Sequence, residues 1–306
     1  MGYVIIGNSA AAIGCVEGIR RVDKEGEITL IASEKHHTYS RPLISYLLEG
    51  KTDLERARAE IAACLNARPE EIYFTSGGTE ADNWALRGVA ELMALKGRKG
   101  GHIITSAIEH HAVLHTAQYL EKQGYEVTYL PVDGRGLVDS AALAIRPDTI
   151  LISIMAANNE IGTIEPVAEL GRIARAHKVL FHTDAVQAVG HIPVDVEAWN
   201  VDLLSLSAHK FRGPKGVGAL YVKKPLRLPA LIQGGGQEKG RRSGTENVPG
   251  IAGLGLAAKM IYQDLDEKVE RMRKLKQRFV EGVGEIPDTV VHGLCDETSA
   301  PHIVSV

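Results

Sequence analysis

The sequence predicts an α/β fold in which a mostly parallel β-sheet is flanked by helices. Short apolar runs alternate along the chain with longer stretches whose apolar residues recur at helical spacing. This alternation is typical of parallel sheets, because two parallel strands need a crossover that is usually helical. The expected strands span residues 3–7, 27–32, 71–76, 102–107, 126–132, 149–156, 179–185, 201–208 and 218–224. The expected helices span residues 54–66, 79–97, 111–124 and 166–178, followed by a charged helix over 265–283 that leads into a smaller domain.

Length and composition limit the classes of protein to which the chain can belong. Its 306 residues suffice for one large domain or two ordinary ones, and 44% hydrophobic with 24% charged residues is typical of globular proteins. A net charge of -3 gives no electrostatic attraction to nucleic acid or to an anionic membrane. No apolar run is long enough to span a bilayer, and the N-terminus lacks a secretory pattern. Three cysteines are too few for a disulfide scaffold, so we expect a reducing, cytoplasmic location.

Polar or reactive residues follow five of the expected strands. In a parallel sheet, ligands collect at the carboxyl ends of the strands, so we expect these residues to share one edge of the sheet. They occur in the segments "GGTE" (77–80), "IEHHA" (108–112), "NNEIG" (158–162), "TDAVQ" (183–187) and "SAHK" (207–210).

The segment "SGGTEADN" (76–83) admits two interpretations. Two glycines and Thr79 before a helix present backbone N–H groups and a hydroxyl, which suits an anion such as phosphate. The alternative is a plain helix cap, with Thr79 as the N-cap residue and Asp82 three positions later. Taken alone, the segment favours the helix cap.

Asp184 and two histidines are further titratable candidates. Asp184 ends a strand that we expect to be buried, so its carboxylate needs a cationic or proton-donating partner. A protonated pyridine nitrogen would satisfy this need, and so would a structural arginine. His111 and His115 lie four residues apart, as in some metal sites, but no third ligand is evident and we expect no metal.

Lys210 follows an apolar strand and precedes the turn "RGPKGVG" (212–218). A lysine at this point is either a solvated loop charge or a reactive amine. A confined amine can form a Schiff base with a carbonyl cofactor. A phosphate cradle, a carboxylate, a lysine and a flat histidine together meet the needs of pyridoxal 5′-phosphate (PLP): phosphate anchoring, ring-nitrogen protonation, covalent attachment and stacking. The combination therefore predicts PLP as the cofactor.

From about Asp53 to Val306 the chain closely resembles the cysteine desulfurases, which are class-V aminotransferase-like PLP enzymes. Six motifs in order carry the resemblance: "TSGGTEADN", "IEHHAVL", "NNEIGT", "HTDAVQAVG", "SLSAHKFRGPKGVGALY" and "GGGQEKGRRSGTENV". The resemblance implies the large-domain fold of the PLP-dependent transferases, with a small domain that is incomplete here.

The resemblance also implies a role for each matching residue. Lys210 would hold PLP through a Schiff base, and His110 would stack on the pyridine ring. Asp184 would pair with the ring nitrogen, with Gln187 and Asn159 near the ring oxygen. The residues implied to hold the phosphate are Gly78, Thr79, Ser207 and His209, with Thr245 reaching across from the partner subunit of a homodimer.

The resemblance further implies a reaction in two halves. PLP activates L-cysteine, and an enzyme cysteine on a loop then takes the sulfur, which leaves L-alanine and supplies sulfur for iron–sulfur cluster assembly. In the family that cysteine follows a strand such as "PHIVSV" (301–306), where this sequence ends, so we expect impaired activity. Cys15 and Cys64 are expected to pack as small hydrophobic residues, and Cys295 is the expected surface thiol. The implied partner is an iron–sulfur scaffold or another sulfur acceptor, and selenocysteine stays open as a substrate.

Residues 1–52 differ from the start of a desulfurase. The segment "VIIGNSAAAIG" (4–14) places Gly7 in a degenerate dinucleotide-binding fingerprint, and Glu34 after the second strand suits a ribose hydroxyl. Together with "HHTYSRPLISYLLEGK" (36–51), it resembles the start of the FAD-dependent pyridine-nucleotide oxidoreductases. A segment this short cannot enclose FAD, so we expect no flavin and hypothesise a chimeric chain.

The sequence therefore predicts three units: a flavin- or dinucleotide-binding-like fragment over 1–52, a PLP-binding large domain over 53–260 and the start of a small domain over 261–306. The predicted function is that of a PLP-dependent cysteine desulfurase, a sulfurtransferase. Two alternatives stay open, namely an FAD- or NAD-binding oxidoreductase fragment and a catalytically inert fragment with the PLP fold.

Overall fold

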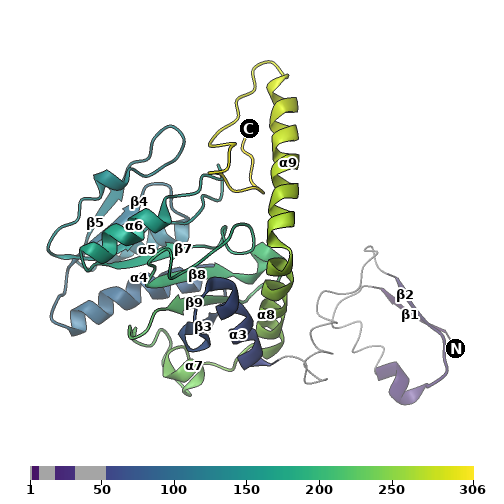
Figure 1. Ribbon diagram of the computed structural model, residues 1–306. Coiled ribbons are helices and arrows are strands. Elements are labelled where there is room, and N and C mark those ends of the chain that lie inside the picture. The colour runs from purple at the N-terminus through teal and green to yellow at the C-terminus, as the bar shows by residue number, and fades with distance from the viewer. Residues whose placement is uncertain (1, 7–17, 32–52) are drawn as a thin grey trace.

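The computed structural model describes residues 2–6, 18–31 and 53–306. Near the N-terminus, β1 (Tyr3–Ile6) and β2 (Ile28–Ile31) pair in parallel and form a two-stranded sheet of their own (Figure 1). Both strands predicted for this region are confirmed. The fingerprint turn with Gly7, Cys15 and Glu34 lies outside the described residues, so the flavin-like assignment stays a prediction.

A seven-stranded sheet forms the centre of the rest of the chain. Its strands are β3 (Ile72–Thr75), β4 (His102–Ser106), β5 (Glu126–Leu130), β6 (Thr149–Ser153), β7 (Leu180–Asp184), β8 (Leu203–Ser207) and β9 (Gly218–Val222). They lie in the order β3-β9-β8-β7-β6-β4-β5, and all neighbours from β8 to β5 are parallel. β9 is antiparallel to both β8 and β3, so β3 points the same way as the parallel strands. The predicted strands and the mostly parallel sheet are confirmed.

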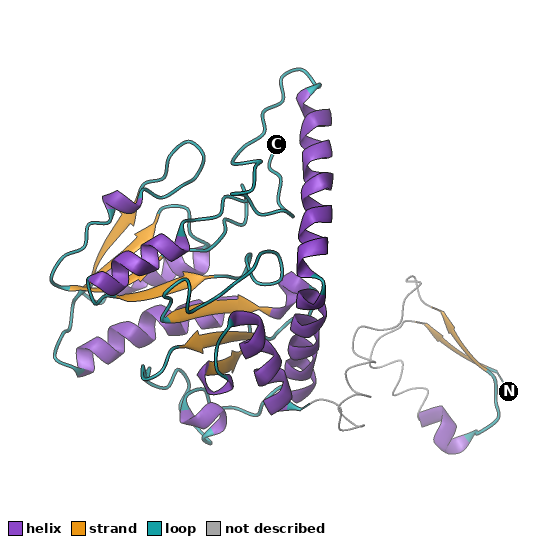
Figure 2. Cartoon of the chain, in the orientation of Figure 1, coloured by secondary structure: helices purple, strands orange, loops and turns teal. Residues whose placement is uncertain are grey.

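Helices cover both faces of this sheet (Figure 2). The helices of this part of the chain are α3 (Leu54–Leu65), α4 (Gly78–Leu95), α5 (His111–Glu121), α6 (Val167–Ala176), the short α7 (Gln237–Gly240), α8 (Val248–Gln263) and α9 (Leu265–Gly284), of which α9 projects away from the sheet (Figure 1). The five predicted helices are confirmed, whereas α7 and α8 were not predicted. Within the described residues, no helix combines the length and hydropathy needed to cross a bilayer.

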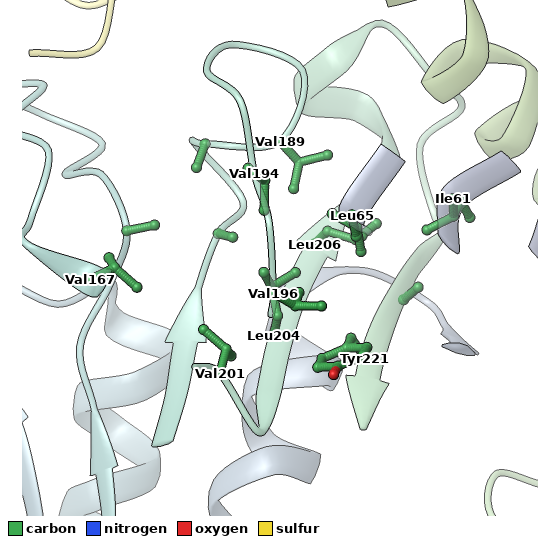
Figure 3. Close-up of a cluster of buried hydrophobic side chains, with 14 of the residues drawn as sticks. Ile61, Leu65, Val167, Val189, Val194, Val196, Val201, Leu204, Leu206 and Tyr221 are labelled. Atoms are coloured by element: carbon green, nitrogen blue, oxygen red, sulfur yellow. The ribbon is translucent and has the colours of Figure 1, made fainter. Parts of the chain in front are cut away.

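Side chains alternate between the two faces along each strand, which gives the domain two hydrophobic clusters. On β6, Leu151 belongs to the cluster that contains Trp84 of α4, and its neighbour Ile152 belongs to the cluster that contains Leu170 of α6. Figure 3 shows part of the second cluster, with Leu65 of α3 beside Leu206 of β8. The two clusters fix the sheet between its helical layers and hold its edges in place.

The pairing of α3 with α8 depends on a glycine. A Cβ placed on Gly255 of α8 would lie 2.5 Å from the Cα of Ala57 on α3 and 2.7 Å from its Cβ. Glycine therefore lets the two helix backbones approach closely. The same composition hides α8 in the sequence, because Pro249 and three glycines (250, 253 and 255) obscure a helical pattern.

A buried ion pair ties the loop after β9 to α3. Arg58 of α3 contacts Glu238 of α7 at two points, 3.0 Å from Nη1 to Oε2 and 2.9 Å from Nη2 to Oε1. Glu238 also accepts a hydrogen bond from the backbone N–H of Phe74 on β3. The two side chains are only 5% and 4% exposed. The pair therefore anchors the first part of the loop that later carries Thr245.

We expect Glu238→Ala to lower the free energy of unfolding by about 3–5 kcal/mol, because the substitution leaves the buried Arg58 guanidinium with only the exposed Glu55, 3.6 Å from its Nε, as a counter-charge. Urea unfolding at pH 7 measures the change. The matched control is the double variant Arg58→Met/Glu238→Met, which removes both charges and should recover most of the loss. Equal destabilisation of the single and double variants would contradict this role for the pair.

Candidate active site

Five strands place residues at one edge of the sheet. β3, β4, β6, β7 and β8 run in the same direction, so their carboxyl ends face the same way. This is the edge at which ligands bind in open α/β sheets. The topology therefore gathers the polar segments that the sequence places after these strands.

The turn between β3 and α4 lies directly against the end of β8. A Cβ placed on Gly78 would lie 3.6 Å from the Cβ of Ser207 and 2.6 Å from Cγ2 of Val186. A Cβ on Gly218, at the start of β9, would lie 2.7 Å from the Cα of Gly77. A side chain at position 218 would therefore push the turn away from the end of β8, and one at position 78 would collide with Val186.

The helix that follows this turn begins without a side-chain cap. The N-cap residue is Gly77, not Thr79, and no side chain accepts its first N–H groups. The alternative interpretation, with Thr79 as the N-cap, is therefore wrong, because the helix starts two residues earlier than a Thr79 cap requires. Thr79 lies exposed in the first turn, where it lines a surface hollow together with His110. The uncapped N–H groups and the helix dipole suit an anion.

Lys210 lies next to a hydrogen bond between Ser207 and His209 at the end of β8. The one-turn helix η3 (Ala208–Phe211) follows Ser207 directly and carries both His209 and Lys210. Ser207 Oγ lies 2.9 Å from His209 Nδ1. Burial lowers the pKa of His209, and the charge of Lys210 lowers it further. Ser207 and a neutral His209 therefore lie beside the exposed amine of Lys210.

Asp184, His110 and Lys210 form one electrostatic cluster. Asp184 ends β7 with 5% exposure, and the N–H of Val186 donates to its Oδ1 at 2.9 Å. One ligand atom each of Asp184, His110 and Asp82 lies within 4.8 Å of the others. Burial raises the pKa of Asp184, whereas the Val186 N–H and the charges of His110 and Lys210 lower it. The cluster thus combines a buried carboxylate with a histidine and a lysine amine.

His110 is held at the start of α5 by its own side chain. Its Nδ1 accepts a hydrogen bond from the backbone N–H of Ala112 at 3.1 Å, so His110 is the N-cap residue of that helix. This bond engages Nδ1 and leaves the imidazole partly in solvent. A planar side chain fixed in this way can stack on a flat ligand beside Asp184.

A buried polar group behind Asp184 was not predicted. His182 of β7 is fully buried, with Nδ1 2.8 Å from Ser153 Oγ and Nε2 3.0 Å from Ser205 Oγ. Its Nε2 also lies 3.7 Å from Oδ1 of Asp82 on α4. Burial lowers the pKa of His182 to about 3, so the ring is neutral. The sequence offered one signal, a histidine within the apolar strand "VLFHTDA" (179–185).

Gln187 contacts a histidine from the far end of the chain. His302 Nε2 lies 3.3 Å from Gln187 Oε1, and the His302 ring stacks on His191 at 3.6 Å with an interplanar angle of 19°. Burial lowers the pKa of His191 to about 4 and that of His302 to about 3, and the charge of Lys210 acts in the same direction. The segment after α9 therefore contributes to the surroundings of Gln187 and Lys210.

The two arginines of "GRRSGTEN" have structural partners. The sequence left them as either helpers of the site or loop charges. Arg242 Nε lies 2.7 Å from Oε1 of Glu80, whose other oxygen lies 2.5 Å from Ser76 Oγ. Arg241 Nη1 donates to the carbonyl of Leu228 at 2.7 Å. Arg242 therefore joins the loop before Thr245 to the turn that contains Gly78.

Two predicted site residues have no contact with this cluster in the described part of the chain. Asn159 is half-buried just after β6, beside Asn158, which fixes the turn by accepting from the N–H groups of Glu160 and Ile161. Thr245 is exposed on the loop before α8. Their roles near the cofactor stay predictions.

The cysteines of the described residues behave as predicted. Cys64 packs against the hydrophobic core, and burial raises its pKa to about 12. Cys295 is exposed. Cys64 is therefore confirmed as a packing residue and Cys295 as a surface thiol.

The residues at this edge fit PLP. The uncapped start of α4 and Ser207 offer donors to a phosphate, the buried Asp184 needs a protonated partner, and Lys210 supplies an amine. Asp82 Oδ1 is buried without a hydrogen-bond partner in the described residues, which leaves an unpaired acidic atom in the same cluster. An anionic group attached to a basic heteroaromatic ring and a carbonyl matches this set of groups.

Comparison with known proteins settles the family. A family model described as aminotransferase class-V matches residues 22–306. The chain belongs to the class-V aminotransferase family. Cysteine desulfurase IscS of Methanosarcina thermophila is 56% identical over 249 residues, which cover 80% of this chain and 61% of that protein. The protein of the same name in Clostridium botulinum is 52% identical over 82% of this chain and 63% of its own length. This member of the class-V family thus spans about three-fifths of the length of these relatives.

Solved structures agree with the fold. A NifS-like protein has a TM-score of 0.80 at 41% identity, covering 86% of this chain and 76% of that chain. A structure of SspA in complex with cysteine has a TM-score of 0.65 at 43% identity, covering 72% of this chain and 62% of that chain. The predicted resemblance to the cysteine desulfurases and the predicted PLP-transferase fold are confirmed.

In this class-V chain we expect His182→Gln to change how stability depends on pH. His182 stays neutral when folded, with a pKa of about 3, whereas its ordinary value is 6.5. The contribution of a neutral His182 to the free energy of unfolding is therefore fully present above pH 6.5. It falls as the pH drops towards 3, because His182 then binds a proton in the unfolded state but not in the folded state. Glutamine at position 182 cannot bind a proton in the unfolded state. The variant's free energy of unfolding, lower than the parent's at pH 7, should therefore approach the parent's on acidification by up to about 1.4 kcal/mol per pH unit.

Urea unfolding of the parent and the variant at pH 7, 6 and 5 provides the measurement. His177→Gln, at the exposed C-terminal end of α6, is the matched control, because it removes a histidine that is not buried. If the difference in free energy of unfolding between His182→Gln and the parent stays constant across this range, His182 is not held neutral in the folded protein.

Proposed function

We propose that the chain is the PLP-binding part of a cysteine desulfurase that acts on L-cysteine and passes its sulfur to an acceptor in iron–sulfur cluster assembly. The observation that carries the proposal is the cluster of Lys210, Asp184 and His110 at the carboxyl edge of the sheet. The names of the relatives support the reaction, and the structural neighbour solved in complex with cysteine supports cysteine as a ligand. A cytoplasmic location belongs to the same proposal.

The residues of this chain would divide the binding of PLP among them. Lys210 would hold the cofactor covalently through its amine, and Asp184 would hold a proton at the ring nitrogen. His110 would lie over the ring and exclude water from one side. When bound, PLP supplies an electron sink for bonds broken at the α-carbon of an amino acid.

The phosphate would be held by the turn and strand ends that meet at Gly218. Gly78 and Thr79 would contribute backbone and hydroxyl donors at the helix start. Ser207 and His209, already 2.9 Å apart, would contribute the opposite side. Gln187 and Asn159 would lie near the ring oxygen, and the contact of Gln187 with His302 would fix the orientation of its amide.

We expect purified protein to develop a visible absorption band on addition of PLP, and Lys210→Ala to abolish it, because the band requires a covalent bond to an amine. Spectrophotometric titration at pH 8 measures it. Lys215→Ala, five residues further along the same turn, is the control and should keep the band. A parent protein without a band would end the cofactor proposal.

We also propose a homodimer in which Thr245 completes the partner's phosphate site. Thr245→Ala should weaken the PLP band, because one hydroxyl donor to the phosphate is lost. Chains with Thr245→Ala mixed with chains with Lys210→Ala should recover roughly a quarter of the parent's band, since half of the dimers are mixed and each has one intact site. No recovery on mixing would show that Thr245 acts within its own subunit.

A further inference from the structure

Asp82 is the one acidic side chain of the site cluster with no assigned role. It lies on α4 with 1% exposure, and its Oδ1 has no hydrogen-bond partner among the described residues. The nearest basic atom is His182 Nε2 at 3.7 Å, beyond hydrogen-bond distance and already 3.0 Å from Ser205 Oγ. A buried acid in this position needs either a counter-charge or its own proton.

The groups that face Asp82 supply no counter-charge. His182 of β7 is neutral, because its two ring nitrogens contact serine hydroxyls and burial lowers its pKa. Asp184 of β7 and Glu109 before α5 are acids, and their charges raise the pKa of Asp82 beyond the increase that burial causes. A hydrogen bond from Ser205 acts in the opposite direction. One ring nitrogen of His110 lies within 4.8 Å of both acids, but its Nδ1 already accepts the Ala112 N–H. The charge of Lys210 acts on Asp184 instead.

Two carboxylates with oxygens less than 5 Å apart cannot both stay ionised in a buried site. Of the two acids, Asp184 is the one whose surroundings stabilise a negative charge. It accepts from the backbone N–H of Val186 and lies near the positive charge of Lys210. Asp82 has the unpaired oxygen, which becomes a donor once it carries a proton.

We propose that Asp82 is a positioning residue that stays protonated next to Asp184, so that Asp184 alone presents a negative charge to the ring nitrogen of a pyridine cofactor. The pair then holds one proton and one negative charge. That single negative charge matches one protonated ring nitrogen. Two negative charges on the pair would repel each other, and a pair with no charge would give the protonated ring nitrogen no counter-charge. The ligand in this statement rests on the proposed function, but the proton on Asp82 is a property of the protein without cofactor.

The protonation state is tested in cofactor-free protein. Protein labelled with ¹³C at the aspartate carboxyl carbons gives an Asp82 signal, which is the one lost in Asp82→Asn. We expect this signal to keep the chemical shift of a protonated acid at pH 7. A shift typical of a carboxylate at pH 7 would overturn the proposal. Because no cofactor is present, this answer does not depend on PLP binding.

The positioning role is tested by PLP affinity, measured from the visible band. Asp82→Ala should weaken binding by about tenfold, because it removes the donor and opens space beside Asp184. Asp82→Asn keeps a neutral donor of the same shape and should bring affinity back to within about threefold of the parent. Asp184→Asn, the matched control for a needed charge, should weaken binding by about a hundredfold.

The outcomes separate the two claims. Equal losses in Asp82→Asn and Asp82→Ala would mean that a negative charge is needed at position 82, which contradicts the proposal. A parent protein that binds no PLP would end the proposed function, while the carboxyl signal still reports on Asp82. Far-ultraviolet circular dichroism checks that each variant is folded, and Asp82→Asn keeps the test decisive if Asp82→Ala does not fold.

Discussion

The close approach of two backbone segments at Gly218 is the constraint on which the candidate site depends. A side chain there would collide with the carbonyl oxygen of Leu206 at 2.5 Å and with Gly77 at 2.7 Å. Because position 218 lacks a side chain, β9 can pair with β8 and β3 at once while the turn after β3 reaches Ser207. The helix start and the lysine-bearing strand end are thus neighbours, although they are far apart in the sequence.

Burial sets the charge of this region. It drives His182, His191 and His302 towards the neutral form, and it raises the pKa of Glu109 to about 8. At Asp184, burial raises the pKa, and the Val186 N–H and the charge of Lys210 oppose part of this rise. Charge therefore persists where a ligand with the opposite charge can meet it, and the surrounding polar groups are neutral hydrogen-bond partners.

Local patterns in the sequence predicted most of the fold. The nine strands and the five predicted helices follow from apolar runs and helical spacing, because each pattern lies within a few adjacent residues. α8 was not predicted, because its glycine content obscures a helical pattern, and the contact of Gly255 with α3 that favours glycine there is not visible in any local pattern. The candidate site likewise contains residues that local patterns reveal and contacts that they do not. Lys210 and Asp184 could be selected as residues at strand ends, whereas the contact of Gln187 with His302 joins positions 115 residues apart. Pairs of that kind become visible only when the chain is folded.

The contact between α3 and α8 has a consequence for the order in which the protein folds during synthesis. α3 ends at Leu65 and α8 begins at Val248, so the ribosome must add the whole sheet before α3 meets its partner helix (Figure 1). At about 5–20 residues per second, this delay lasts roughly 10–40 s. During that time the apolar face of α3 around Ala57 lacks the cover that α8 provides. The growing chain therefore exposes part of its future core until α8 has been synthesised.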